Sequence, residues 1–162
     1  MASIKLITAY WQQGSPYNLD TLVGSLIQQS EYNKRPKSFE FSYKSFPKIG
    51  DEILVGIQLT LTISDSMMVI GEGFFTSKSP QENWTIKKID VEYYSGYEPD
   101  NINIIALSSE NAVITNGTNG YAKIGSALYL DNLKLNVEKE KVIKSEYYIH
   151  VFPNPEKSYI NV

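Results

Sequence analysis

Aromatic side chains stand beside amide and carboxylate residues at several places in the chain. The apolar C–H faces of a sugar ring stack on aromatic rings, while its hydroxyl groups need amides and carboxylates as hydrogen-bond partners. One such cluster lies near the N-terminus, a second lies within 94–100, and a third follows a loop rich in Asn and Gly. The candidate carbohydrate-binding residues are Trp11, Tyr17, Tyr94, Tyr97, Asp100 and Tyr121.

These aromatic residues have a structural alternative. A β-protein routinely buries tyrosine and tryptophan in its core, and this chain has 12 tyrosines and 2 tryptophans. We assign Trp84, Tyr93 and Tyr129 to the core, because they occupy positions that fit an alternating apolar pattern. The clusters in loops remain the candidates for ligand contact.

Pairs of carboxylate residues could support a second kind of chemistry, the hydrolysis of glycosidic bonds. Glycoside hydrolysis needs two carboxyl groups about 5–9 Å apart across a cleft. Asp90 and Glu92 are two residues apart on an expected strand and would point to one face, Glu98 and Asp100 flank a proline, and 51–52 is an acidic turn. Acids at strand ends are also typical of solvated surfaces, so we assign no catalytic residue.

Histidine and cysteine chemistry is excluded from the main part of the chain. His150 is the only histidine, and it lies close to the C-terminus. A Ser-His-Asp triad, a His-ligated zinc site or a His general base within 1–137 is therefore excluded. Cysteine is absent from the sequence, which excludes disulfides and thiolate sites.

Asp131 is the candidate metal ligand. Its carboxylate, with backbone oxygens of the N-terminal strand, would suit a structural calcium ion, which takes hard oxygen ligands. The alternative is a turn in which the side chains of Asp131 and Asn132 bond to the backbone.

The composition of the chain limits the classes of partner that we expect it to bind. The chain has 162 residues, of which 42% are hydrophobic and 20% charged, which is typical of a globular protein. Its net charge of −3 comes from interspersed acids and bases, so nucleic acid is not an expected partner. No apolar run approaches the roughly 20 residues of a membrane span. The N-terminus lacks a signal-peptide pattern, so we expect a natural leader upstream of Met1.

Alternation of apolar and polar residues predicts an all-β fold. Phe39, Phe41 and Tyr43 share one face of an expected strand, and 52–63 continues the pattern through a long second strand. Gly56 interrupts the other face of that strand and indicates a bulge or a close approach. About eight or nine strands at this spacing predict a jelly-roll β-sandwich of two antiparallel sheets.

Several segments are less regular. We expect a pair of short strands within 67–75, a bulge at Lys87-Lys88, where the apolar period shifts, and a closing hairpin in which Asp131-Asn132 turns between 127–130 and 133–137. The segment 19–29 has a weak helical spacing, but extended structure is favoured.

A series of short motifs in a characteristic order runs through residues 30 to 137. It includes the Phe-Glu-Phe-Ser-Tyr-Lys strand, a Gly-Asp turn, Ile-Gly-Glu-Gly, the Pro-Asp-Asn-Ile-Asn-Ile step and the closing Gly-Ser-Ala-Leu-Tyr-Leu-Asp-Asn-Leu-Lys-Leu. The motifs begin at Phe39, Gly50, Ile70, Pro99 and Gly125. This order resembles the family named putative carbohydrate metabolism domain and related carbohydrate-binding-like jelly rolls of exported bacterial proteins. The resemblance implies a two-sheet jelly roll among glycan-handling proteins, and it implies no reaction.

The C-terminal segment has a different character. Pro153 and Pro155 flank Asn154 and force a turn between short alternating segments. The segment resembles the beginning of the C-terminal sorting domain of the type IX secretion system, which implies a secreted protein or one on the outer cell surface. We therefore expect a jelly-roll domain in 1–137, a charged linker in 138–147 and a truncated sorting domain in 148–162.

The favoured hypothesis is a non-catalytic carbohydrate-binding or adhesion module with a polysaccharide or glycan as its partner. One alternative is a small carbohydrate-active hydrolase that uses an acidic pair. The other is a structural or protein-interaction β-sandwich, with a protein partner at the cell surface.

Overall fold

The protein is an all-β sandwich. The computed structural model describes residues 3–10, 21–110 and 122–137, and every regular element in these segments is a strand. The strands are β1 (Ile4–Ile7), β2 (Ala9–Tyr10), β3 (Thr21–Leu22), β4 (Ser25–Glu31), β5 (Pro36–Phe46), β6 (Ile53–Ile63), β7 (Ser66–Ser77), β8 (Gln81–Asp90), β9 (Glu92–Tyr93), β10 (Asn101–Leu107) and β11 (Ala127–Val137). The predicted fold class is confirmed.

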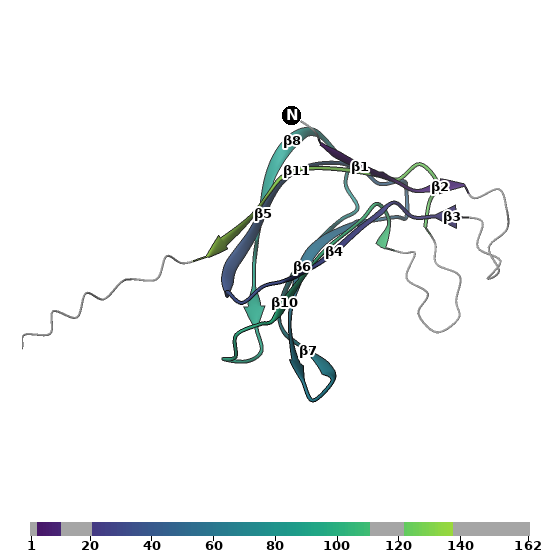
Figure 1. Ribbon diagram of the computed structural model, residues 1–162. Coiled ribbons are helices and arrows are strands. Elements are labelled where there is room, and N and C mark those ends of the chain that lie inside the picture. Colours follow the sequence, from purple (N-terminus) through teal and green to yellow (C-terminus); the bar gives the residue numbers. More distant parts are fainter. Residues whose placement is uncertain (1–2, 11–20, 111–121, 138–162) are drawn as a thin grey trace, which may run out of the picture.

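Two antiparallel sheets form the layers of the sandwich. One has four strands in the order β1-β11-β5-β8, and the other has five in the order β4-β10-β6-β7-β9. Figure 1 shows the two layers facing each other, with the small β2–β3 ribbon projecting from one end. From β4 onward the chain crosses repeatedly between the sheets, as in a jelly roll, so residues distant in sequence meet on each face.

The core lies between the sheets and is built from alternate residues of the long strands. Phe39, Phe41 and Tyr43 of β5 point inward, and the rings of Phe41 and Tyr43 contact Phe75 of β7. From β6, four side chains without solvent exposure face them: Ile53, Val55, Ile57 and Leu59. The predicted inward faces of these two strands are confirmed.

Three local predictions are wrong, and each error concerns a bulge. The segment 67–75 belongs to one continuous strand, β7, whose register with β6 shifts between Leu59 and Thr60. β11 is also continuous: a register shift and the positive φ of Asn132 (52°) form a bulge where a hairpin turn was expected. β8 pairs with β5 without interruption from Thr85 to Asp90, so no bulge lies at Lys87-Lys88.

The favoured extended structure of 19–29 is confirmed over its described residues, most of which lie in β3 and β4. Among the residues that the structure describes, none belongs to a helix long and apolar enough to cross a membrane.

A buried carboxylate joins the loops at one end of the sandwich. Asp51 is only 1% exposed. Its Oδ1 accepts hydrogen bonds from the Ser109 hydroxyl at 2.6 Å and the Glu52 amide at 2.8 Å, and its Oδ2 accepts from the Ser126 hydroxyl at 2.6 Å and the Lys123 amide at 3.0 Å. Asp51 therefore fastens the β5–β6 turn to the segments around β10 and β11.

Candidate functional site

Three of the predicted carbohydrate-binding residues lie in the described part of the chain. Tyr94 and Tyr97 stand on the connection between β9 and β10 and are 55% and 64% exposed. Asp100 ends this connection. Trp11, Tyr17 and Tyr121 lie outside the described residues, so their role stays a prediction.

The connection is fixed to the sandwich by Arg35. Its guanidinium lies 3.9 Å from the ring centre of Tyr93 and donates hydrogen bonds to the carbonyl oxygens of Ser95, at 2.8 Å, and Tyr97. The Tyr93 hydroxyl in turn donates to the Pro36 carbonyl at 2.9 Å, and burial raises the pKa of this phenol to about 12. The exposed tyrosines thus project from an anchored segment.

Asp100 is a structural fastener at the start of β10. Its carboxylate accepts hydrogen bonds from the Asn101 side chain and from the Thr62 amide, both at 2.9 Å. The hydrogen bond from Asn101 is the main cause that lowers the pKa of Asp100 below its ordinary value, and the bond from Thr62 acts in the same direction. A carboxyl group with a lowered pKa is ionised at neutral pH, so Asp100 is unsuited to act as a general acid.

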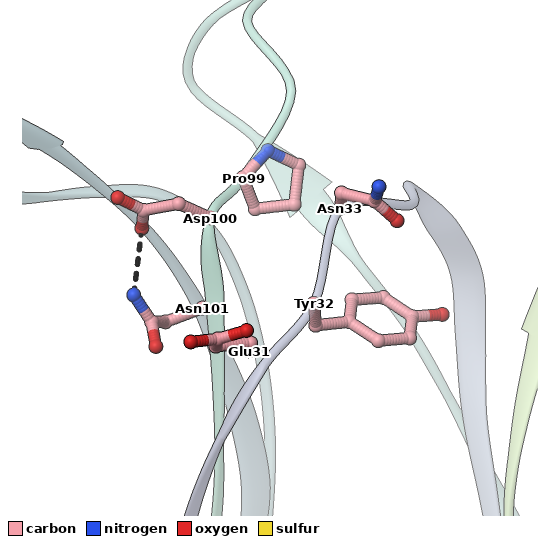
Figure 2. A pocket seen from close by; sticks show the side chains of 6 residues that line it. All are labelled: Glu31, Tyr32, Asn33, Pro99, Asp100 and Asn101. Atoms are coloured by element: carbon pink, nitrogen blue, oxygen red, sulfur yellow. Dashed lines mark hydrogen bonds between the residues drawn. The ribbon is translucent and has the colours of Figure 1, made fainter.

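A cavity of about 620 Å³ opens beside Asp100. Figure 2 shows that one wall comes from the end of β4 and the residues after it, and the other from the start of β10. Its lining residues are Glu31, Tyr32, Asn33, Pro99, Asp100 and Asn101. The polar part of this lining consists of amides and carboxylates, and the ring of Tyr32 packs against the core.

A row of polar side chains crosses the outer face of the five-stranded sheet, the face turned away from the core. Residues directly opposite each other on paired strands share a face. The register places Gln29, Asn103, Gln58, Glu72 and Glu92 opposite one another in turn on β4, β10, β6, β7 and β9. We call these five residues the polar row.

Glu72 is the centre of the hydrogen bonds in this row. Its Oε2 accepts from the Gln58 amide at 3.1 Å, and its Oε1 accepts from the Tyr94 hydroxyl at 2.7 Å. The hydrogen bond to Glu72 is the main cause that raises the pKa of Tyr94 above its ordinary value, with the charges of Glu72 and Glu92 acting in the same direction. The predicted residue Tyr94 is therefore tied to the polar row.

An apolar row lies beside the polar row, two residues along each strand. It comprises Ile27, Ile105 and Phe74, with Gly56 between the last two in the register. A Cβ atom on Gly56 would lie 2.2 Å from Cδ1 of Phe74, so the ring covers the glycine backbone. The close approach predicted at Gly56 is confirmed, and it holds Phe74 flat on the sheet with 40% of its surface exposed.

The two rows have complementary chemistry. Neighbouring side chains on one face of a strand are about 7 Å apart, so one bound molecule can span both rows. The apolar row offers flat hydrophobic contact, and the polar row offers amide donors with carboxylate and amide acceptors. Five residues of these rows could not be predicted from the sequence, because only the pairing of the strands shows that they are adjacent: Gln29, Gln58, Glu72, Phe74 and Asn103.

The predicted acidic pairs are not supported by the structure. Asp90 ends β8 in the four-stranded sheet, whereas Glu92 begins β9 in the five-stranded sheet, so the two carboxylates do not share one strand face. Glu98 is exposed, while its predicted partner Asp100 is held by hydrogen bonds. The opposed pair on the surface is instead Glu72 and Glu92.

Two aromatic residues assigned to the core lie on the surface. Trp84 and Tyr129 belong to the outer face of the four-stranded sheet, and Trp84 is 44% exposed. The assignment is wrong because β8 and β11 carry apolar residues on both faces, so alternation alone does not identify the inner one. Tyr93 does pack against the core.

Asp131 lies at the bulge of β11. Its Oδ1 accepts a hydrogen bond from the Asn132 amide at 2.7 Å, as in the local turn considered above. Within 3–10, 21–110 and 122–137, no three His, Cys, Asp or Glu side chains form a group that would hold a metal ion. Calcium takes six to eight oxygen ligands, so a site at Asp131 would depend on backbone oxygens or water and stays a prediction.

Comparison with known structures shows what the fold is similar to. A protein from Bacteroides thetaiotaomicron VPI-5482, described as a putative glycoside hydrolase, has a TM-score of 0.67 at 16% sequence identity. The match covers 85% of this chain and 54% of that protein, so this chain spans about half of its length.

A protein from Bacteroides vulgatus ATCC 8482, described in the same words, has a TM-score of 0.60 at 14% identity over 84% of this chain and 73% of its own. No family model and no curated protein matches the sequence. At these identities the likeness establishes the β-sandwich fold.

Proposed function

We propose that the protein is a non-catalytic glycan-binding module whose binding surface is the outer face of the five-stranded sheet. The observation that carries the proposal is the adjacency of the polar and apolar rows, with Tyr94 and the cavity beside Asp100 at their edge. Phe74 would stack on the apolar face of a sugar ring, and Glu72, Gln58 and Asn103 would bind its hydroxyl groups.

Two further observations support a role in carbohydrate handling. The structural neighbours are both described as putative glycoside hydrolases. The sequence resembles carbohydrate-binding-like jelly rolls of exported bacterial proteins, and its C-terminal segment resembles the start of a type IX sorting domain. The module would therefore act outside the cell or on its surface, attached to a polysaccharide.

Affinity gel electrophoresis tests the proposal with soluble neutral polysaccharides: glucomannan, mixed-linkage β-glucan and starch. We expect retardation of the wild type by at least one of them, and Phe74→Ala should weaken binding about tenfold. Phe74→Tyr keeps the ring and should restore binding. Ile63→Ala is the matched control, because Ile63 is also an exposed apolar residue, at 48%, but lies at the β6–β7 hairpin.

The proposal fails if none of these polymers retards the wild type. It also fails if Phe74→Ala and Ile63→Ala behave alike. A parallel series with Tyr97→Ala shows whether the β9–β10 connection extends the surface.

A second candidate is a small hydrolase, favoured by the opposition of Glu72 and Glu92. Side chains directly opposite on antiparallel strands have Cβ atoms about 5 Å apart, which is within reach of the carboxyl separation in retaining glycosidases. Like charges placed in this way destabilise a sheet, so the pair lowers the stability of the fold. Release of reducing sugar that is lost in both Glu72→Gln and Glu92→Gln, with binding retained in Glu92→Gln, would replace the binding role by catalysis.

A further inference from the structure

Trp84 is an exposed tryptophan on the outer face of the four-stranded sheet. It lies on β8, at the edge of the four-stranded sheet, and the side-chain nitrogen of Lys44 on the neighbouring β5 stands 5.3 Å from the centre of its ring system. A tryptophan buried for stability would not keep 44% of its surface in water. Its exposed ring is available for contact with a ligand.

A second lysine–aromatic pair continues the same line across the sheet. The register places Lys5 opposite Tyr129 and Tyr129 opposite Lys44, and the nitrogen of Lys5 lies 5.5 Å from the centre of the Tyr129 ring. The lysine–aromatic row therefore runs Lys5, Tyr129, Lys44, Trp84 over β1, β11, β5 and β8. With strands about 4.8 Å apart, it spans about 14 Å.

A pocket of about 370 Å³ lies beside this row, over residues that are two positions along the strands from Lys5, Tyr129 and Lys44, and its volume is within the size range of small-molecule sites. Trp84 forms its apolar wall, and its polar lining comes from Ser3, Ser42, Asp131 and Asn132. The bulge at Asp131-Asn132 places an extra residue in β11, and the side chains of both Asp131 and Asn132 line this pocket. The pocket thus combines an aromatic platform with hydroxyl, amide and carboxylate groups.

The two sheets differ in charge. The strands of the five-stranded sheet contain three acids, Glu31, Glu72 and Glu92, and no lysine or arginine. The strands of the four-stranded sheet contain six lysines and four acids, and one of these lysines, Lys87, faces the core, where its amine lies 4.6 Å from the centre of the Phe75 ring. Two of those lysines, Lys5 and Lys44, stand over the aromatic rings of the row. An anionic group would therefore be favoured beside Lys5 and Lys44, and disfavoured on the five-stranded sheet, whose strands carry acids only.

We propose that the outer face of the four-stranded sheet is a second binding surface, specific for glycans that contain uronic acids. A sugar ring would stack on Trp84, with its hydroxyl groups bound by Ser42, Asp131 and Asn132. The carboxylate of that sugar or its neighbour would pair with Lys44, and a further uronate would reach Lys5 across Tyr129. This surface is separate from the one proposed above and takes a different class of ligand.

Affinity electrophoresis in gels containing polygalacturonate tests this inference. We expect retardation of the wild type, and much weaker retardation in gels containing the same polymer after its carboxyl groups have been reduced to alcohols. Trp84→Ala should weaken binding about tenfold or more, because it removes the stacking platform. Lys44→Gln should weaken it about fivefold, as expected for an exposed ion pair.

Lys88→Gln is the matched charge control. Lys88 lies on the same strand as Trp84, does not line the pocket and pairs with Asp90 at 3.8 Å. Its substitution should leave retardation unchanged. Dextran sulfate provides the control for charge alone, and should retard the wild type no more than it retards Trp84→Ala.

Four results would overturn the inference: no retardation by polygalacturonate, equal retardation by the reduced polymer, equal losses in Lys44→Gln and Lys88→Gln, or an unchanged Trp84→Ala variant. Phe74→Ala separates the two surfaces, because it should leave polygalacturonate binding intact. Failure on neutral polysaccharides with success on polygalacturonate would reject the five-stranded surface alone. Success on neutral polysaccharides with failure on polygalacturonate would reject only the four-stranded surface.

Discussion

Asp51 and Glu72 are both carboxylates that accept several hydrogen bonds, but they occupy opposite environments. Asp51 is 1% exposed and receives four hydrogen bonds from three segments of the chain. Glu72 lies on the outer face of a sheet and receives one bond from an amide and one from a phenol, Gln58 and Tyr94. The first carboxylate is enclosed by its donors, while the second keeps an open side.

This difference separates a structural polar cluster from the one proposed to bind a ligand. A buried charge is tolerated only when its hydrogen-bonding capacity is filled, and then its loss leaves the donors around it unsatisfied. A surface carboxylate with free acceptor capacity contributes little to folding and can exchange water for a ligand. We therefore expect substitutions at the Asp51 cluster to change stability, and substitutions in the polar row to change binding.

The largest effect is expected for Asp51→Ala. The substitution leaves the hydroxyls of Ser109 and Ser126 and two backbone amides without their acceptor, so the free energy of unfolding should fall by about 3 kcal/mol or more. Glu72→Ala, the matched surface change, should alter it by less than about 1 kcal/mol. Urea unfolding followed by circular dichroism gives both values, and equal losses would erase the distinction between the two regions.

A smaller loss of stability is expected for Gly56→Val, which tests how the proposed binding face is built. A Cβ at this position would meet Phe74 at 2.2 Å and the backbone oxygen of Gly73 at 2.6 Å, so the ring or the strand must move. We expect a loss of about 1–3 kcal/mol in urea unfolding, together with loss of neutral-glycan retention. The matched control is Gly96→Ala, because nothing lies within 4 Å of a Cβ there; a neutral Gly56→Val would show that Phe74 does not depend on the glycine.

The sequence was sufficient for the sandwich and its long inner faces. In β5 and β6 the apolar side chains alternate with polar or small ones, so Phe39, Phe41, Ile57 and Leu59 have one possible inner side. In β8 both faces carry apolar residues, and Trp84 was wrongly assigned to the core. Periodicity identifies a strand, but it identifies the buried face only where the two faces differ.

The candidate surfaces could be predicted only in part. Tyr94 was found because it is an aromatic residue beside acids in the sequence, which is a local signal. Glu72, Gln58 and Asn103 come from three different strands, and their adjacency depends on register. Bulges shift register by one residue, and the two in β7 and β11 were read as breaks between strands.

The pH dependence of stability gives a third test of the contrast between Asp51 and Glu72, with a smaller expected effect. Burial raises the pKa of Asp51, but hydrogen bonds from Ser109, Ser126 and two backbone amides outweigh it and leave the pKa below its ordinary 3.8. The folded protein then binds fewer protons at this group than the unfolded chain does. Its contribution to stability is complete above pH 3.8 and is lost as the pH falls through the lower folded value.

We therefore expect the stability difference between the wild type and Asp51→Asn to be constant near neutral pH and to shrink below pH 3.8. Thermal unfolding at a series of pH values measures it, and carboxylates common to both proteins cancel in the difference. A difference that grows on acidification would mean that the hydrogen bonds do not favour the ionised form of Asp51.

The smallest expected effect is a change in the pKa of one tyrosine. The phenol of Tyr94 donates to Glu72 at 2.7 Å, and this bond is the main cause that raises its pKa. Glu72→Gln keeps the size of the side chain but removes its charge, so the pKa of Tyr94 should move down toward its ordinary value of 10.0. Stability should change by no more than about 0.5 kcal/mol.

NMR titration of ¹³C-labelled tyrosine resolves this phenol from the others, and Glu98→Gln serves as the control, since Glu98 is an exposed acid near Tyr94 in the chain. An unchanged pKa of Tyr94 in Glu72→Gln would mean that the phenol is free in solution rather than tied to the polar row. The open carboxylate would then lack the fixed neighbour that orients it, and the contrast with Asp51 would rest on Gln58 alone.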